Sequence, residues 1–230
     1  MDGYLLQRIR AAFPEASDPM LVRAINEGLG VADDTISGTW FLQNEAGSDA
    51  RGFVRRAGVL GMLHEYAVRG DLPFETQFER QSRGSWHWLN MTAHGVLGHV
   101  VKTDGAFIFP KDGPAKRDKR ITNQGDFFEM PKLVPIEEII EPDSDVYAWL
   151  SYGCDKLGNV THALWGVPAA DDDVYMAYAD ILASAARQGD VKPQENIVEP
   201  PIRVALKDQI IEALRRDAAE DDDAETEGEE

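Results

Sequence analysis

Residues 146–168 read VYAWLSYGCDKLGNVTHALWGVP, two apolar runs on either side of a short polar segment. Runs rich in valine, tyrosine and tryptophan are typical of strands, and the DKLGN segment between them is typical of a turn. The stretch therefore predicts an antiparallel hairpin. Both faces of its strands carry apolar side chains, which indicates a sheet that is covered on at least part of each side.

The segment 95–110, GVLGHVVKTDGAFIFP, predicts a second hairpin. Asp104-Gly105 is a strong signal for a two-residue turn, because both residue types tolerate the positive φ that such turns need. This register pairs Val101 with Ile108, and the proline at the end stops the second strand. Just before it, SWHWLNMTA at 85–93 alternates like a further strand and places His87 and Leu89 on the face opposite Trp88.

Apolar residues at helical spacing flank these strands. They predict helices over 5–13, from Asp18-Pro19 to Gly28 or Gly30, from Ser48 or Asp49 to Gly70, and from the aspartates at 171–173 to Gly189. We expect an α+β fold with N-terminal helices, a central, mainly antiparallel sheet of four to six strands built from two hairpins, and C-terminal helices. Residues 1–189 are predicted to form a single globular domain, and 190–216 a connector and a C-terminal helix. The last segment, 217–230, has nine acids in fourteen positions and no large apolar group, so we expect it to be disordered.

Composition narrows the function classes. The chain has 230 residues, of which 43% are hydrophobic, and a formal net charge of -18. No apolar run approaches the roughly 18 residues that a bilayer span needs, and the N-terminus does not resemble a signal peptide. With a single cysteine, Cys154, no intrachain disulfide is possible, so we expect a cytoplasmic protein with no membrane partner.

The charge is unevenly distributed along the chain. Residues 1–50 carry a net charge of -5, residues 51–120 a net charge of +5 and residues 121–230 a net charge of -18. Overall acidity argues against non-specific coating of nucleic acid, yet it leaves room for one local cationic surface.

The segment 111–120, KDGPAKRDKR, is that cationic surface, with five basic residues in ten. We expect a solvent-exposed loop whose arginines hold phosphates and whose neighbouring polar side chains add hydrogen bonds. The candidate binding residues are Lys111, Lys116, Arg117, Lys119, Arg120 and Asn123. The expected partner is a nucleic acid or an acidic protein surface, with Phe107, Phe109, Trp86 and Trp88 as nearby aromatics for base stacking. The alternative is a solvated loop that pairs with the chain's own acids, with those aromatics in the core.

Catalytic and metal sites have weaker signals. Nothing completes a zinc ligand set around His87, His94 and His99, although His87 and His99 would share a face in alternating strands. Metal-dependent nuclease chemistry needs paired carboxylates and a lysine, which Asp126, Glu129 and Lys132 supply as residue types. Cys154 could act as a nucleophile only with a basic partner such as His162. The glycine-rich motifs that bind nucleotide phosphates are absent. We therefore expect no cofactor.

The sequence favours a cytoplasmic, non-enzymatic interaction or regulatory protein whose basic contact loop lies at 111–124. Two alternatives stay open. One is a metal-dependent enzyme that cleaves phosphodiesters, and the other is a protein-binding inhibitor that acts through the acidic C-terminus. The sequence does not indicate an oligomeric state.

Overall fold

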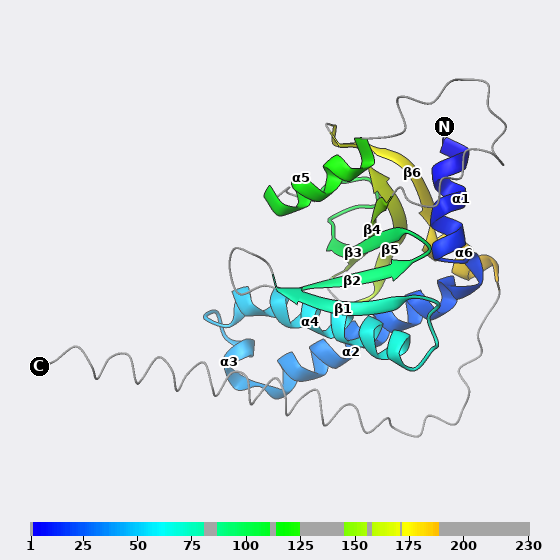
Figure 1. Cartoon of the computed structure of the whole chain (residues 1–230). Coiled ribbons are helices and arrows are strands. Elements are labelled where there is room, and N and C mark those ends of the chain that lie inside the picture. Colours follow the sequence, from blue (N-terminus) through cyan, green and yellow to red (C-terminus); the bar gives the residue numbers. More distant parts are fainter. Residues whose placement is uncertain are drawn as a thin grey trace, which may run out of the picture. The chain divides into compact units, whose positions relative to one another are not determined.

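The chain forms one six-stranded sheet with helices on both of its faces (Figure 1). The computed structural model describes residues 2–80, 87–110, 114–124, 145–155, 158–170 and 172–188. Contacts divide the chain into two units, Met1–Asp190 and Val191–Glu230, and all of the described residues belong to the first. The predicted connector at 190–216 and the predicted tail at 217–230 lie outside the described residues. None of the helices in these ranges has both the length and the apolar character that crossing a membrane requires.

The elements follow one another as helices, strands, a short helical insertion, strands and a final helix. The helical elements are α1 (Asp2–Ala12), η1 (Glu15–Ser17), α2 (Asp18–Gly38), α3 (Trp40–Gln43), α4 (Ser48–Val68), α5 (Pro114–Arg120), η2 (Ile121–Gln124) and α6 (Ile181–Arg187). The strands are β1 (Glu75–Arg80), β2 (His87–Ala93), β3 (Val96–Lys102), β4 (Val146–Cys154), β5 (Val160–Pro168) and β6 (Tyr175–Asp180). This arrangement confirms the α+β class, the N-terminal helices and the central sheet.

The strands lie in sequence order, and every neighbouring pair is antiparallel except β3 and β4, which run parallel. The predicted hairpin at 146–168 is confirmed as β4 and β5, and its turn contains Gly158 with a φ of +84°. A further hairpin joins β2 to β3 through His94 and Gly95, with φ values of 46° and 70°. Two successive positive φ values are the requirement of a tight turn that follows the twist of the strands.

The predicted hairpin at 95–110 is wrong. Val101 pairs with Ser151 of β4 rather than with Ile108, and the chain leaves the sheet after Lys102. Ile108 instead donates its backbone N–H to the carbonyl of Gly105, within a turn. The Asp-Gly signal is local, whereas pairing with β4 gives β3 a buried neighbour along its whole length. Tertiary burial therefore outweighs the local turn preference.

The helix side of the sheet, which we call the helix face, holds the main core. The core joins apolar residues of α1, α2 and α4 to alternate residues of the strands. At its centre the ring of Trp165 stacks on Phe13, with centroids 3.8 Å apart. A Cβ at Gly98 would lie 2.9 Å from the Trp165 ring, so glycine makes room for that ring on β3. Stacked, fully buried aromatics of this size supply much of the apolar burial of a domain.

Helices α2 and α4 cross so closely that their backbones touch. A Cβ at Gly28 would lie 2.6 Å from the Cα of Val59, and one at Gly58 would lie 2.3 Å from the carbonyl oxygen of Gly28. The predicted end of α2 at Gly28 or Gly30 is therefore wrong, because the helix continues to Gly38. Gly28 serves the helix crossing and does not terminate the helix.

The end of the first unit combines a strand and a helix where one long helix was predicted. Residues from Tyr175 to Asp180 form the edge strand β6, and Asp180 then caps α6 by accepting the N–H of Ala183 at 2.8 Å. Apolar residues on β6 fit a helical spacing as well as a strand, so periodicity does not distinguish the two over so short a run. The predicted helix from 171 to 189 is thus reduced to Ile181–Arg187.

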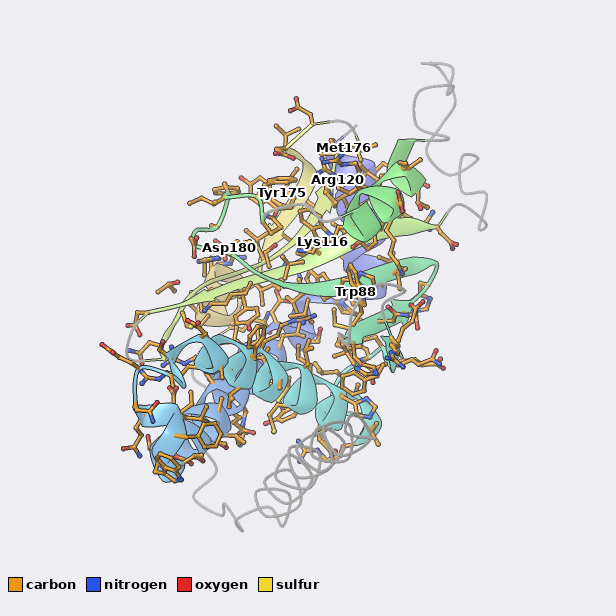
Figure 2. The ribbon with its side chains drawn as sticks, turned by 90° about the vertical axis from the view of Figure 1, so that its left-hand side faces the viewer. Trp88, Lys116, Arg120, Tyr175, Met176 and Asp180 are labelled. Atoms are coloured by element: carbon orange, nitrogen blue, oxygen red, sulfur yellow. The ribbon has the colours of Figure 1, made fainter. Side chains whose placement is uncertain are left out.

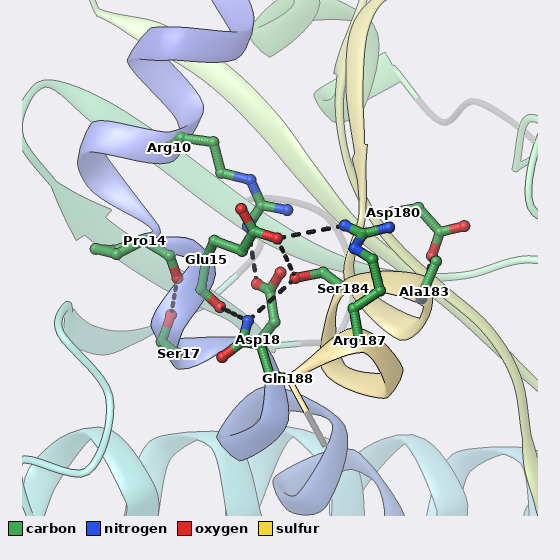
Figure 3. A network of polar contacts seen from close by, with 10 residues as sticks. All are labelled: Arg10, Pro14, Glu15, Ser17, Asp18, Asp180, Ala183, Ser184, Arg187 and Gln188. Carbon is green, nitrogen blue, oxygen red and sulfur yellow. Dashed lines mark hydrogen bonds and ion pairs between the residues drawn. The ribbon is translucent and has the colours of Figure 1, made fainter.

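A polar network fastens α6 to the N-terminal helices (Figure 3). Glu15 accepts hydrogen bonds from Ser184 at 3.0 Å and from Arg187 at 3.3 Å. Beside it, the buried Asp18 accepts from Arg10 at 2.9 Å rather than capping its own helix. Burial raises the pKa of Asp18, and the hydrogen bond from Arg10 opposes that shift. The network joins segments that are far apart in the sequence.

We expect Gly28→Ala to lower the free energy of unfolding by about 1–3 kcal/mol, because the methyl group must displace the backbone of α4. Gly30→Ala is the matched control in the same helix, since a Cβ there would meet nothing within 4 Å. It should raise stability by about 0.5–1 kcal/mol through helix propensity. Thermal or urea unfolding of both variants measures the difference, and equal stability of the two would contradict the close crossing.

Candidate functional site

The opposite side of the sheet, which we call the α5 face, carries a row of aromatic rings. Successive ring centroids lie 4.5 Å apart for Trp88 and His99, 5.2 Å for His99 and Tyr147, and 6.4 Å for Tyr147 and Trp149. Beyond them, Phe109 lies 5.2 Å from Trp149. Because alternate residues of each strand share a face, neighbouring strands bring these rings together. Tyr147, Trp149 and Phe109 of this row belong to a second, smaller core, together with Val101.

Helix α5 lies over this row, and Arg120 anchors it (Figure 2). The predicted exposed loop is wrong in two respects: residues 114–120 form a helix, and Arg120 is only 3% exposed. Its guanidinium lies over the rings of Phe109 and Trp149, at 5.4 and 5.8 Å. It donates from Nε to the carbonyl of Ala169 at 2.6 Å and forms an ion pair with Asp173 at 3.1 Å. The planar guanidinium suits this combination of stacking and forked hydrogen bonding.

Asn123 fixes the next turn, η2, to the sheet. Its side-chain oxygen accepts the N–H of Tyr147 at 2.8 Å, and its nitrogen donates to the carbonyls of Tyr147 at 3.0 Å and Pro168 at 2.8 Å. The paired residues of β4 and β5 end at Trp149 and Gly166, and Pro168, two positions beyond, has no N–H to donate. The amide of Asn123 thus replaces missing ladder bonds, and the side chain is 1% exposed.

Arg120 and Asn123 hold the helix, and three of the predicted binding residues on it remain at least partly exposed. Arg117 is exposed, and Lys116 and Lys119 are half-buried. Lys119 lies 3.6 Å from Glu79 of β1 and 5.9 Å from the ring centre of Trp88. Lys111 lies outside the described residues. The structure therefore separates the basic segment into an anchor and a cationic ridge, which we define as Lys116, Arg117 and Lys119.

A chain of hydrogen bonds runs inward from Glu79 beneath this ridge. Asn90 donates from Nδ2 to Glu79 at 2.8 Å, so its Oδ1 accepts from Nε2 of His99 at 2.5 Å. Nδ1 of His99 then accepts the hydroxyl of Tyr147 at 3.0 Å. Asn90 and His99, in the middle of the chain, each donate one bond and accept one, which is what buried polar side chains require. The chain fixes His99 as a neutral imidazole.

Electrostatics keep His99 neutral. Burial, followed by the positive charges of Lys119, Lys116 and Arg56, lowers the pKa of His99 from 6.5 to about 3. At the outer end, the hydrogen bond from Asn90 and the charge of Lys119 lower the pKa of Glu79. An imidazole with so low a pKa does not act as a general base near neutral pH. The chain of hydrogen bonds from Glu79 to Tyr147 therefore has a structural role beneath the ridge and is not a catalytic centre.

The other residues singled out in the sequence are not brought together. His87 lies on the face opposite His99, since Asn90 is the residue of β2 that pairs with His99, so the expectation of a shared face is wrong. Cys154 contacts the core of the helix face, whereas His162 lies opposite Gly153 and bonds to Thr103 at 2.8 Å. Across the described ranges, no three His, Cys, Asp or Glu side chains are grouped to hold a metal ion. Asp126, Glu129 and Lys132 lie outside the described residues.

Two parts of the site had no signal in the sequence analysis. The acceptors of Arg120 come from the β5–β6 turn at 169–173, about fifty positions along the chain. Glu79 lies on β1, a strand that the sequence did not predict. Glu79 and Asn90 lie on adjacent strands and meet only because of the register between them, which the sequence does not reveal.

No protein-family model matches this chain, and comparisons with curated proteins and with solved structures return no match.

The buried imidazole makes stability depend on pH in a defined direction. Because the pKa of His99 is about 3 in the folded chain and 6.5 in the unfolded one, the unfolded chain gains the proton first. The stabilisation is complete above pH 6.5 and is lost as pH falls toward 3, by up to about 1.4 kcal/mol per pH unit. His99→Gln, which can donate and accept but does not titrate, should show a shallower loss of unfolding free energy over that interval. His87→Gln, an exposed control, should match the parent, and equal slopes for all three proteins would contradict the assignment.

Asn123→Ala should destabilise the protein by about 3 kcal/mol, because it leaves three backbone groups without their partners. Thr122→Ala changes an exposed neighbour and should stay within about 0.5 kcal/mol of the parent. Urea unfolding followed by circular dichroism measures both. A loss at Asn123 no larger than that at Thr122 would show that η2 is not fixed to the sheet in this way.

Proposed function

We propose that the protein is an interaction protein that binds nucleic acid through the α5 face, with the cationic ridge of Lys116, Arg117 and Lys119 as its phosphate contact. The observation that carries the proposal is the anchoring of α5 by Arg120 and Asn123, which holds a short basic helix on the sheet in one orientation. A fixed cation loses less conformational freedom on binding than one on a free loop.

The proposal narrows the predicted contact segment. Arg120 and Asn123 act as anchors, because their polar atoms already bond to the chain itself. The three ridge residues lie on one helix of two turns, with Arg117 exposed and Lys116 and Lys119 half-buried, and this spacing matches a contact with a few consecutive phosphates. Glu79 and Asp118 lie nearby and reduce the positive field, so we expect weak binding that is seen best at low salt.

The alternatives receive less support from the described residues. A phosphodiester-cleaving enzyme would need Asp126, Glu129 or Lys132, and an acidic inhibitor would need the C-terminal acids; the structure describes neither set. The ridge, by contrast, lies within the described residues, on a helix that Arg120 and Asn123 fix to the sheet.

Replacing Lys116, Arg117 and Lys119 together with alanine should weaken binding to a single-stranded oligonucleotide and flatten its salt dependence. Three phosphate contacts correspond to a slope of about -2 in a plot of log affinity against log salt concentration. Fluorescence anisotropy over a salt series measures the slope for each protein.

The matched control replaces Arg23, Arg69 and Arg187, which lie in the helix layer, and removes the same charge. It should retain the slope of the parent. Equal weakening by both triple variants would show that binding follows net charge, and absence of binding by the parent at low salt would reject the proposed function.

A further inference from the structure

Two aromatic side chains of the α5 face project into solvent beside the buried row. Phe107, in the loop after β3, is 60% exposed, and Tyr178, on β6, is 49% exposed. Their rings meet edge to face, with centroids 5.0 Å apart and an interplanar angle of 77°. Two large rings that touch each other and remain half exposed form an apolar surface with accessible π-faces.

The sheet explains why Tyr178 is uncovered. It lies opposite Gly166 of β5, which has no side chain to cover it. The space above Gly166 is taken by Tyr175, whose ring would lie 2.4 Å from a Cβ built there. Tyr175 in turn bonds to Ser151 at 2.9 Å and contacts Phe109 at 4.6 Å. Tyr178 is thus left at the outer edge of a ring cluster whose inner members are fixed.

The loop that carries Phe107 is held at both ends. On one side, Thr103 donates its N–H to the carbonyl of Tyr152 at 2.9 Å. On the other, the ring of Phe109 is packed between Trp149, Tyr175 and the guanidinium of Arg120. The same Arg120 ends α5, so the loop and the cationic ridge share one anchor (Figure 2). The exposed pair and the ridge are therefore positioned together on one face.

We infer that Phe107 and Tyr178 form a stacking platform for unpaired bases, which makes single-stranded nucleic acid the ligand of the α5 face. This inference rests on the proposed function, because the ridge supplies the phosphate contacts that bring a strand to the rings. Cationic side chains that follow a backbone, with exposed rings beside them, are the combination found in proteins that bind single strands. A duplex keeps its bases stacked on one another and offers no face to Phe107 or Tyr178.

The test compares two probes and two variants. The probes are an oligothymidylate and an abasic oligonucleotide of the same length, which keeps the phosphates and lacks the bases. The variant Phe107→Leu/Tyr178→Leu removes the rings and keeps apolar side chains. The control Trp40→Leu/Phe53→Leu removes two exposed rings from the helix layer. Phe107→Leu alone, in a loop, is the second variant if the double change impairs folding.

We expect the platform variant to bind oligothymidylate at least about fivefold more weakly than the parent and to bind the abasic strand as the parent does. The control should bind both probes like the parent. If the parent binds the abasic strand as tightly as oligothymidylate, or if the platform variant loses no affinity, the stacking inference is wrong while the phosphate-binding ridge stands. If the parent binds neither probe at low salt, both the proposed function and this inference are wrong.

Discussion

The parallel pairing of β3 with β4 is the constraint on which the rest of the α5 face depends. It joins two antiparallel groups of strands into one sheet, and a parallel neighbour cannot be reached by a tight turn. The chain between Lys102 and Val146 must therefore travel back to the other end of the sheet. Its described parts, the loop at 103–110 and the helices α5 and η2, lie on the side that α1, α2 and α4 leave open. The basic segment lies on the α5 face because it is part of the connection between β3 and β4, which crosses that face.

The two faces of the sheet are covered by different kinds of side chain. On the helix face, apolar side chains and close glycine contacts fill the core, and Trp165 packs into the space that Gly98 leaves. On the α5 face, the thin cover of one short helix brings polar groups inside, so rings alternate with satisfied hydrogen bonds at His99, Asn123 and Arg120. A buried polar group with every bond made specifies one arrangement, because any shift leaves a donor or acceptor unpaired. The α5 face is therefore positioned by directional bonds more than by apolar area.

Local signals in the sequence predicted the local structure. The helix at 5–13, the long helix that begins near Ser48 and the β4–β5 hairpin each rest on neighbours within a few positions. The parallel pairing could not be predicted, since its evidence is a strand more than forty positions away, and the Asp104-Gly105 turn signal pointed elsewhere. The burial of Arg120 could not be predicted for the same reason, because its acceptors Ala169 and Asp173 are about fifty positions away in the sequence. Of the candidate site, the sequence predicted Arg117 as an outward cation, and missed the anchor that holds it in place.

The position of the crossover also bears on the order in which the molecule folds. Helices α2 and α4 are neighbours in the chain and meet through Gly28 and Gly58. The β3–β4 pairing closes a longer loop, since Val96 and Val146 are 50 positions apart and Gly28 and Gly58 are 30 apart, and contacts between more distant segments form more slowly. The helix pair thus offers an early nucleus, with the β1–β2–β3 strands following it along the chain. The α5 face, which needs both halves of the sheet, is completed last, so a chain emerging from the ribosome leaves His99 without Tyr147, its ring partner on β4, until that strand has been made.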